Sequence, residues 1–399
     1  MSPRQLPIIL ALGTTQTLAW ASSYYIPAIL ADPIGHDLGI SSNWVFAAFS
    51  ASLVISALLG PRIGRQIDHA GGRQVLCGSN LILAAGLALL ACTWSIPVLA
   101  IAWVLLGIGM GLGLYDAAFA ALGQIYGNNA RRSITGITLL AGFASTVGWP
   151  LTAWGLDAIG WRETCLAWAA AHILIGLPLN FFFLPRGSTA ETVTGPAIKP
   201  HIPIDRTMVL LAFTFAAAWS VTGAMAAHLP RILEANGAST VQAIAAGALI
   251  GPAQVFARII EAGFLSRYHP LISTRLACMT HPIGAAIMMA SGGTAASAFA
   301  LFHGAGNGIL TIARGTLPLA IFGPDHFGYR LGLIGAPSRM AQAIAPLAFG
   351  LLIDVMGGRV LIVSSALSLS ALAALMLLRP EQQDRQPSPD PASGRNRAA

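Results

Sequence analysis

Long apolar runs alternate with short polar breaks along nearly the whole chain. Charged residues, glycines and prolines gather in the breaks, and few charges fall inside the runs. An apolar run of about 20 residues is long enough to cross the hydrocarbon core of a bilayer as a helix. The pattern therefore predicts twelve membrane-spanning helices, near residues 7–30, 43–63, 75–95, 97–122, 132–156, 163–184, 207–229, 240–263, 272–292, 295–321, 331–353 and 360–378.

The composition excludes an ordinary soluble protein. Of the 399 residues, 55% are hydrophobic and only 9% are charged, whereas a soluble domain carries about 25% charged residues. We therefore expect the lipid bilayer to surround the chain. Four cysteines lie singly in apolar runs without metal-type spacing, which predicts reduced packing residues. The first run is too long for the apolar core of a signal peptide and lacks a small-residue cleavage site behind it.

The distribution of lysine and arginine predicts the orientation. An even number of spans puts both termini on one side of the membrane. Sixteen of the 22 basic residues fall in the breaks on that side and three in those on the other side. Because basic loops stay in the cytoplasm, we expect cytoplasmic termini in the cell inner (plasma) membrane. The basic residues form no patch with interleaved aromatic residues, so the net charge of +7 indicates no nucleic-acid partner.

A repeated turn predicts the domain organisation. The pattern Asp-x-x-Gly followed by Gly or Trp and then Arg begins at Asp68, Asp157 and Asp354, and the last two copies lie 197 residues apart, about half the chain. Copies on alternate faces indicate inverted three-helix repeats within each half. We expect two six-helix bundles, at 1–184 and 207–378, a cytoplasmic linker at 185–206, and a polar, disordered cytoplasmic tail at 379–399.

The segment GPRIGRQIDHAGGRQVL resembles the loop motif of the major facilitator superfamily. This resemblance implies an all-α membrane protein with two pseudo-symmetric six-helix bundles, which works as a monomer by alternating access. It also implies that Gly64, Asp68 and Arg73 form part of a cytoplasmic gate. A second segment, GFASTVGWPLTAWG, is similar to the antiporter motif of drug exporters, except that Trp149 separates Gly148 from Pro150.

Four charged side chains fall within the predicted spans: Asp116, Arg258, Arg314 and Arg339, with Glu261 nearer a helix end. A charge at membrane depth costs roughly 2.5 to 3.5 kcal/mol on insertion scales and usually faces a cavity. In the superfamily that the chain resembles, the helices carrying these residues line the central cavity. Arg258 and Glu261, three positions apart on one helix, are predicted as a gate pair.

Three arginines against one aspartate within the predicted spans favour an anionic substrate, because a guanidinium group binds carboxylates and oxyanions in a bidentate manner. Polar residues at helical spacing extend the arginine faces. The predicted substrate-binding residues are Arg314, Arg339, Asn307, His303, Thr311, Gln342 and Tyr24.

The repeat offset places Asp116 almost opposite Arg314. Two interpretations stay open: a structural ion pair, or a proton-coupling role for Asp116 in competition with the substrate.

The sequence predicts a secondary transporter that moves a small anion by proton-linked transport or exchange. One alternative is proton-driven efflux of drugs or other toxic compounds, and another is a membrane sensor that does not transport. The chain contains no phosphate-binding glycine loop and no arrangement of catalytic or metal-ligating residues. We therefore expect no enzymatic activity, cofactor or metal, and a small molecule as the partner.

Overall fold

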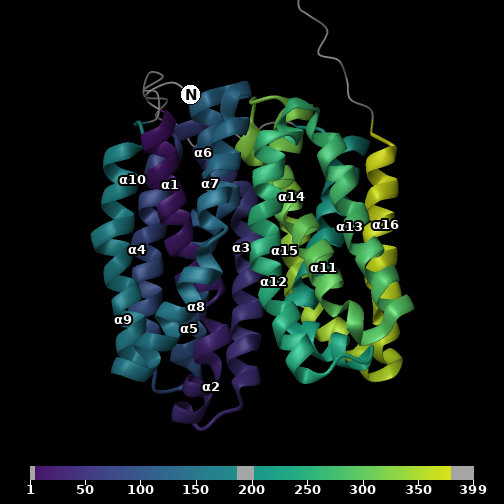
Figure 1. Ribbon diagram of the computed structural model, residues 1–399. Coiled ribbons are helices and arrows are strands. Elements are labelled where there is room, and N and C mark those ends of the chain that lie inside the picture. The colour runs from purple at the N-terminus through teal and green to yellow at the C-terminus, as the bar shows by residue number, and fades with distance from the viewer. Residues whose placement is uncertain (1–4, 187–201, 379–399) are drawn as a thin grey trace, which may run out of the picture.

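The structure is a computed structural model that describes residues 5–186 and 202–378. The described residues form helices joined by short turns, with no strand among them. Figure 1 shows the helices from α1 to α10 (purple to teal) gathered on one side and those from α11 to α16 (green to yellow) on the other. The start of α1 and the end of α16 lie at the same edge of the molecule. Most of the predicted linker and the predicted tail lie outside the described residues.

In the first half, four of the predicted single spans are interrupted helical runs. Turns, single extended residues or π-helical segments interrupt the first, fourth, fifth and sixth predicted spans. The helices are α1 (Gln5–Ala19), α2 (Pro27–Leu38), α3 (Ser42–Ala70), α4 (Gly72–Ala91), α5 (Ile96–Gly113), α6 (Tyr115–Tyr126), α7 (Ala130–Ala141), α8 (Ala144–Ile159), α9 (Trp161–Ala171) and α10 (Leu177–Phe183), with π-helical segments at Trp20–Tyr24 and His172–Gly176.

The second half has longer, less interrupted helices. They are α11 (Arg206–Ala235), α12 (Thr240–Gly263), α13 (Pro270–Ser291), α14 (Ala296–Phe322), α15 (Phe327–Met356) and α16 (Val360–Met376). Eight helical stretches of the described chain are long and apolar enough to cross a membrane, and three of these, of 64, 53 and 50 residues, each hold two or more helices. The chain is thus a multi-pass helical membrane protein.

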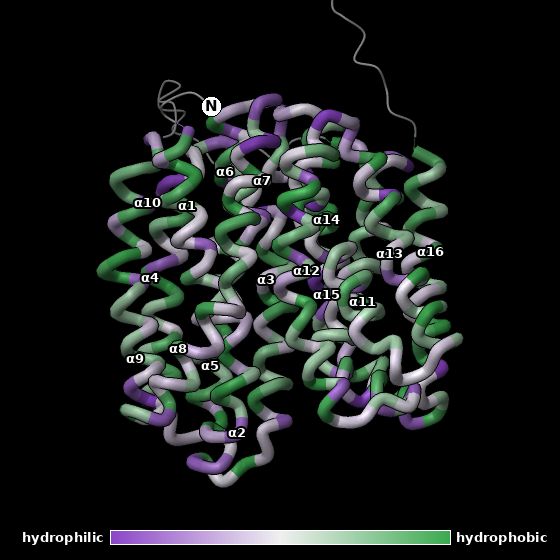
Figure 2. Tube along the Cα trace, in the orientation of Figure 1, coloured by the Kyte–Doolittle hydropathy of each residue, from purple (hydrophilic) through white to green (hydrophobic). Residues whose placement is uncertain are grey.

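Many large apolar side chains are exposed on the surface of the molecule, more than is usual for a water-soluble protein. Hydrophobic positions dominate the middle of both halves, and hydrophilic positions gather at the two ends (Figure 2). Leu174, Phe182 and Val355 are 73%, 76% and 85% exposed. Contiguous exposed apolar surface of this kind fits lipid, in which every backbone polar group must be satisfied within the helices.

The repeated turn has a backbone reason for its glycine. Gly71, Gly160 and Gly357 follow the helix ends of the three copies and have φ values of 87°, 92° and 56°. Positive φ is costly for residues with a Cβ atom, so glycine is the residue that lets the chain turn there. The face of the molecule that carries the first copy, after α3, is called the motif face below.

Candidate functional site

Asp116 lies at a helix start created by a break in the chain. The apolar run from Ile96 is helical to Gly113, and Leu114 is extended, with φ −79° and ψ −176°. A new helix, α6, then begins at Tyr115 and carries Asp116 in its first turn. A negative charge is favourable at a helix N-terminus, where backbone N–H groups and the helix dipole point toward it.

Two arginines from the other half converge on this carboxylate. Arg314 of α14 donates from Nε to Oδ1 at 2.6 Å and from Nη2 to Oδ2 at 2.8 Å. Arg339 of α15 donates to Oδ2 from Nε at 3.1 Å and from Nη2 at 2.8 Å. The Asp116 carboxylate thus accepts four charge-assisted hydrogen bonds. Asp116, Arg314 and Arg339 are called the charged triad.

The charged triad is enclosed on several sides. Arg339 also donates to the Ser56 hydroxyl of α3, and the Arg314 guanidinium lies 4.7 Å from the ring centre of Trp219 of α11. A Cβ atom on Gly335 would lie 2.9 Å from Asp116 Oδ2. The side chains of Arg314, Arg339 and Asp116 are only 6%, 10% and 12% exposed.

The charged triad carries one positive charge in excess. Removing one partner from a buried ion pair is strongly destabilising, because it leaves a charge without compensation. Here one carboxylate neutralises one of two guanidinium groups. An anion that reaches the charged triad would therefore meet a net attraction and donors with the geometry that carboxylates prefer.

Asp68 joins the two halves at the motif face. Its Oδ1 and Oδ2 accept hydrogen bonds, each of 2.8 Å, from the backbone N–H groups of Gly328 and Tyr329 in the first turn of α15. Gly64, one turn before Asp68, packs directly on Gly328, and a Cβ atom there would overlap the Gly328 carbonyl. The two predicted gate residues Gly64 and Asp68 therefore lie at an interface between the halves.

The third motif residue, Arg73, has a different position. Its guanidinium lies 4.2 Å from the ring centre of Phe181, on α10 of its own half. This is a cation–π contact within the first half. A gate residue was expected to contact the second half, whereas the described contact of Arg73 is with its own half.

The predicted pair between Arg258 and Glu261 is wrong as a local pair. Glu261 instead pairs with Arg131 near the start of α7, with 3.1 Å between Arg131 Nη2 and Glu261 Oε1. Arg258 donates to the carbonyls of Thr138, in the last turn of α7, and of Gly308. Carbonyls near a helix C-terminus lie at the negative end of the helix dipole and attract a cation. Both residues thus join α12 to α7 of the other half rather than to each other.

The polar stripe on α14 divides between two surroundings. Arg314 reaches the charged triad, but His303 contacts His281 of α13 and Asn307 accepts a hydrogen bond from Thr222 of α11. This corrects the expectation that the whole stripe faces the central cavity, because α14 is covered by α11 and α13 along this length. Thr311 is buried, and its hydroxyl donates back to the Asn307 carbonyl.

Gln342 and Tyr24 form a further link between the halves. Gln342 Nε2 donates to the Tyr24 hydroxyl at 2.7 Å. Tyr24 belongs to a cluster of rings, with centroids 5.0 Å from Trp20 and 5.3 Å from Phe49. Gln342 lies one turn beyond Arg339 on α15, so this cluster borders the charged triad.

Comparison with known proteins identifies the family and supports the predicted fold. The family model of the Major Facilitator Superfamily matches residues 12–302, which is more than half of the chain. The chain belongs to the Major Facilitator Superfamily. A Thermoproteus tenax protein described as an uncharacterized 38 kDa protein in the 23S RNA operon is 26% identical over 364 residues, or 90% of this chain and 92% of that protein.

Solved structures of this superfamily share the fold at low sequence identity. The proton:xylose symporter XylE, bound to 6-bromo-6-deoxy-D-glucose, has a TM-score of 0.74 at 12% identity, with 94% of this chain and 95% of that chain covered. The human organic anion transporter MFSD10 has a TM-score of 0.72 at 16% identity, with 95% and 100% covered. These relatives are membrane transporters rather than enzymes, and the chain is accordingly a superfamily transporter of small molecules.

This superfamily member is closed at the motif face. The hydrogen bonds between its two halves run from Asp68 and Arg131 at that face, through the charged triad, to Gln342 near the middle of α15. Beyond Gln342, the described part of the chain has no further hydrogen bond between the halves. The polar contacts between the halves thus close one face and stop near the middle of α15.

Three contacts of the site were not predicted from the sequence. Two of them touch the charged triad, through Ser56 and Trp219. The third joins α7 to α12 through Arg131. Ser56 had a signal, because it shares a helix face with Gly60 and Gly64 at steps of four. Small residues at that spacing let helices approach closely in membranes. Trp219 and Arg131 had none, since only the packing of distant segments brings them to the site.

Proposed function

We propose that this chain is a secondary active transporter that moves a small organic or inorganic anion through a site at the charged triad. Two six-helix halves, at 1–184 and 207–378, would rock about this site as a monomer with twelve spans. The interrupted helical runs of the first half support this count, since each accounts for one predicted span. MFSD10, described as an organic anion transporter, is one of the structural neighbours of the chain.

One observation carries the proposal. Two guanidinium groups from one half bind a single carboxylate of the other half, with an uncompensated positive charge in a nearly buried site. The Asp116 carboxylate thereby occupies the position that a substrate carboxylate or oxyanion would take. A substrate anion would compete with Asp116 for Arg314 and Arg339, whereas a cation would be repelled.

The same competition would couple transport to protons. While both arginines bind Asp116, protonation of the Asp116 carboxylate is unfavourable. It would remove acceptor sites for the arginines and leave two buried positive charges without a counter-charge. Once an anion replaces it, the Asp116 carboxylate loses its four hydrogen bonds and takes up a proton. The anion and the proton would then be carried in the same step of the cycle.

A thermal-shift screen of purified protein tests the substrate class. The probes are acetate, lactate, succinate, phosphate, sulfate and a tetraphenylphosphonium cation, applied to the wild type and to Arg314→Lys. A ligand that binds the native state raises its melting temperature. We expect an anion to stabilise the wild type but not the variant, because lysine keeps the charge and loses the bidentate fork.

Arg162→Lys is the matched control for this screen. Arg162 also binds a carboxylate, that of Asp37 at 2.7 Å, but both side chains are at least one-third exposed, away from the charged triad. The control should respond to anions as the wild type does. Stabilisation by the cation that survives Arg314→Lys would reject the anion proposal and favour drug efflux.

The proposed orientation puts the motif face and both termini in the cytoplasm of the inner (plasma) membrane. A native cysteine offers a test, because Cys92 is exposed at the end of α4, away from the motif face, whereas Cys165 and Cys278 are buried. A membrane-impermeant maleimide added to intact cells should label Cys92. Labelling of Cys92 only after the cells are opened would reverse the orientation.

A further inference from the structure

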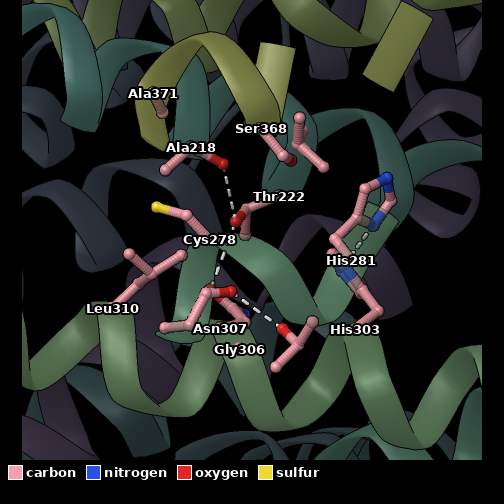
Figure 3. Close-up of a pocket in the computed structure, with 13 residues that line it drawn as sticks. Ala218, Thr222, Cys278, His281, His303, Gly306, Asn307, Leu310, Ser368 and Ala371 are labelled. Carbon is pink, nitrogen blue, oxygen red and sulfur yellow. Dashed lines mark hydrogen bonds between the residues drawn. The ribbon is translucent and has the colours of Figure 1, made fainter. Parts of the chain in front are cut away.

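The second half contains a small, mostly apolar cavity that the charged triad does not use and that a few polar side chains reach. Its volume is about 20 Å³, enough for roughly one water molecule. The cavity lies among α11, α13, α14 and α16, and Figure 3 shows two histidines at one end of it. The polar residues that line it are Thr222, Thr280, His281, His303, Asn307 and Ser368.

The two histidines form a directly bonded pair. His281 Nδ1 and His303 Nδ1 are 3.1 Å apart, and both residues are more than nine-tenths buried. On the far side, His281 Nε2 lies 2.9 Å from the hydroxyl oxygen of Ser364 on α16. A hydrogen bond between two Nδ1 atoms requires one of them to carry a proton and the other a lone pair.

The proton positions leave two arrangements of the neutral pair. If the Ser364 hydroxyl donates to the Leu361 carbonyl, 3.1 Å away, then His281 donates from Nε2 and accepts at Nδ1. His303 must then carry its proton on Nδ1, which leaves a lone pair on Nε2. If Ser364 instead donates to His281, every proton moves one position along and His303 Nε2 carries the proton.

His303 Nε2 is the atom at which the pair can exchange a proton. Among residues 5–186 and 202–378 it has no hydrogen-bond partner. The amide NH₂ group of Asn307, which also lies on the cavity wall, likewise has no acceptor in these segments. A water molecule in the cavity would find a donor in Asn307 and an acceptor in His303 Nε2, as a buried water requires.

One aromatic ring lies against the pair. The ring of Phe299 is stacked on His303, with 6.0 Å between the ring centres, and an aromatic face attracts a cation. Cys278 of α13 is the other titratable group on the cavity wall, and α11 and α16 contribute none. α12 carries Arg258 on the opposite side of α14, bonded to the Gly308 carbonyl.

A polar stripe leads from the pair to the charged triad. Asn307, Thr311 and Arg314 follow His303 on α14 at steps of four, four and three residues, which keeps them on neighbouring positions of one helix face. Thr311 donates to the Asn307 carbonyl at 2.8 Å. A change of charge at His303 would therefore be felt through a buried, low-dielectric path toward Arg314.

We propose that the His281–His303 pair and one water in its cavity form a second protonation site, which binds a proton at His303 Nε2 while Asp116 is held by the two arginines. A hydronium ion supplies the proton: its O–H bond breaks, water is left, and the proton adds to the Nε2 lone pair of His303. This inference rests on the proposed function in one respect, namely that transport is proton-linked. It assigns the waiting proton to the second half rather than to Asp116.

The test is a pH titration of protein with ¹⁵N-labelled histidine in lipid nanodiscs, without any substrate. A correlation between two ¹⁵N nuclei across the N–H···N hydrogen bond identifies the pair in the wild type. We expect the signal of one unprotonated ring nitrogen of the pair to be lost as the pH falls from 8 to 5, where histidines titrate. His303→Gln should abolish this transition.

The matched control is His172→Gln, since His172 is a buried histidine of the first half. Both of its ring nitrogens have partners at 2.8 Å, the Ser22 hydroxyl and Asn80 Oδ1. This variant should keep the transition of the pair. A wild-type pair that does not change between pH 8 and 5 would overturn the inference without any reference to a variant.

The outcome is separable from that of the proposed function. Because the titration needs no substrate, it can fail while anion binding at Arg314 stands, which would leave the histidines a structural pair. It can also succeed while Arg314→Lys leaves anion binding unchanged, which would reject the anion site alone.

Discussion

Substitution of Asp68 by asparagine should open the motif face. The Asp68 carboxylate accepts two backbone hydrogen bonds at the start of α15, each 2.8 Å long. Asparagine has one acceptor oxygen and no charge, so it loses one bond and the attraction of the helix N-terminus. A hydrogen bond to a charged group is worth about 1.5–3 kcal/mol. A loss of about 2 kcal/mol shifts the equilibrium between closed and open roughly 30-fold toward open.

The assay is a distance distribution between spin labels on α3 and α15 at the motif face, in lipid nanodiscs. Asp68→Asn should move population from the short distance to a longer one and slow turnover, with ligand affinity nearly unchanged. Asp354→Asn is the control, because Asp354 begins the equivalent turn but pairs with Arg231 in an exposed position, where an ion pair contributes little. An unchanged distribution in Asp68→Asn would refute the gate assignment.

Three further outcomes are expected. Gly64→Ala should hold the motif face open by the same spin-label assay, because its Cβ would overlap a carbonyl of α15, whereas Gly78→Ala should not, since nothing lies within 4 Å of its Cβ. Arg131→Gln should lower the free energy of unfolding by about 1–3 kcal/mol, because it leaves the buried glutamate of α12 unpaired; equal loss in Arg132→Gln would argue against this contact. Burial and two neighbouring arginines lower the pKa of His269, so its contribution to stability should be full above about pH 6.5 and fall as the pH drops below it; His269→Asn should flatten that slope in chemical unfolding.

Periodicity and repeats predicted the elements that depend on local pattern. The apolar runs mark the helical regions, and the repeat offset anticipated that Asp116 and Arg314 would meet, as their 2.6 Å contact confirms. Helix interruptions escaped prediction, because Leu114 looks like an ordinary helix former and because glycines such as Gly142 are common within membrane helices. Tertiary packing decides where such a run bends.

Partner choice was the weakest part of the prediction. A spacing of three residues allows Arg258 and Glu261 to meet on one helix, yet each finds a partner on α7. The packing of α7 against α12 gives each group a partner in the other half: Glu261 pairs with Arg131, and Arg258 donates to the Thr138 carbonyl. Likewise, the face of α14 is polar over several turns, but only its Arg314 end reaches the interface between the halves.

The central claim is that a substrate anion and Asp116 compete for Arg314 and Arg339, and anion affinity in Asp116→Asn tests it most directly. Calorimetric titration of the wild type and the variant would use the anion that stabilises the wild type in the thermal-shift screen. Removal of the competing carboxylate should tighten binding at least tenfold, about 1.4 kcal/mol, and abolish proton uptake on binding. Equal or weaker anion binding in Asp116→Asn, with proton uptake retained, would contradict the account.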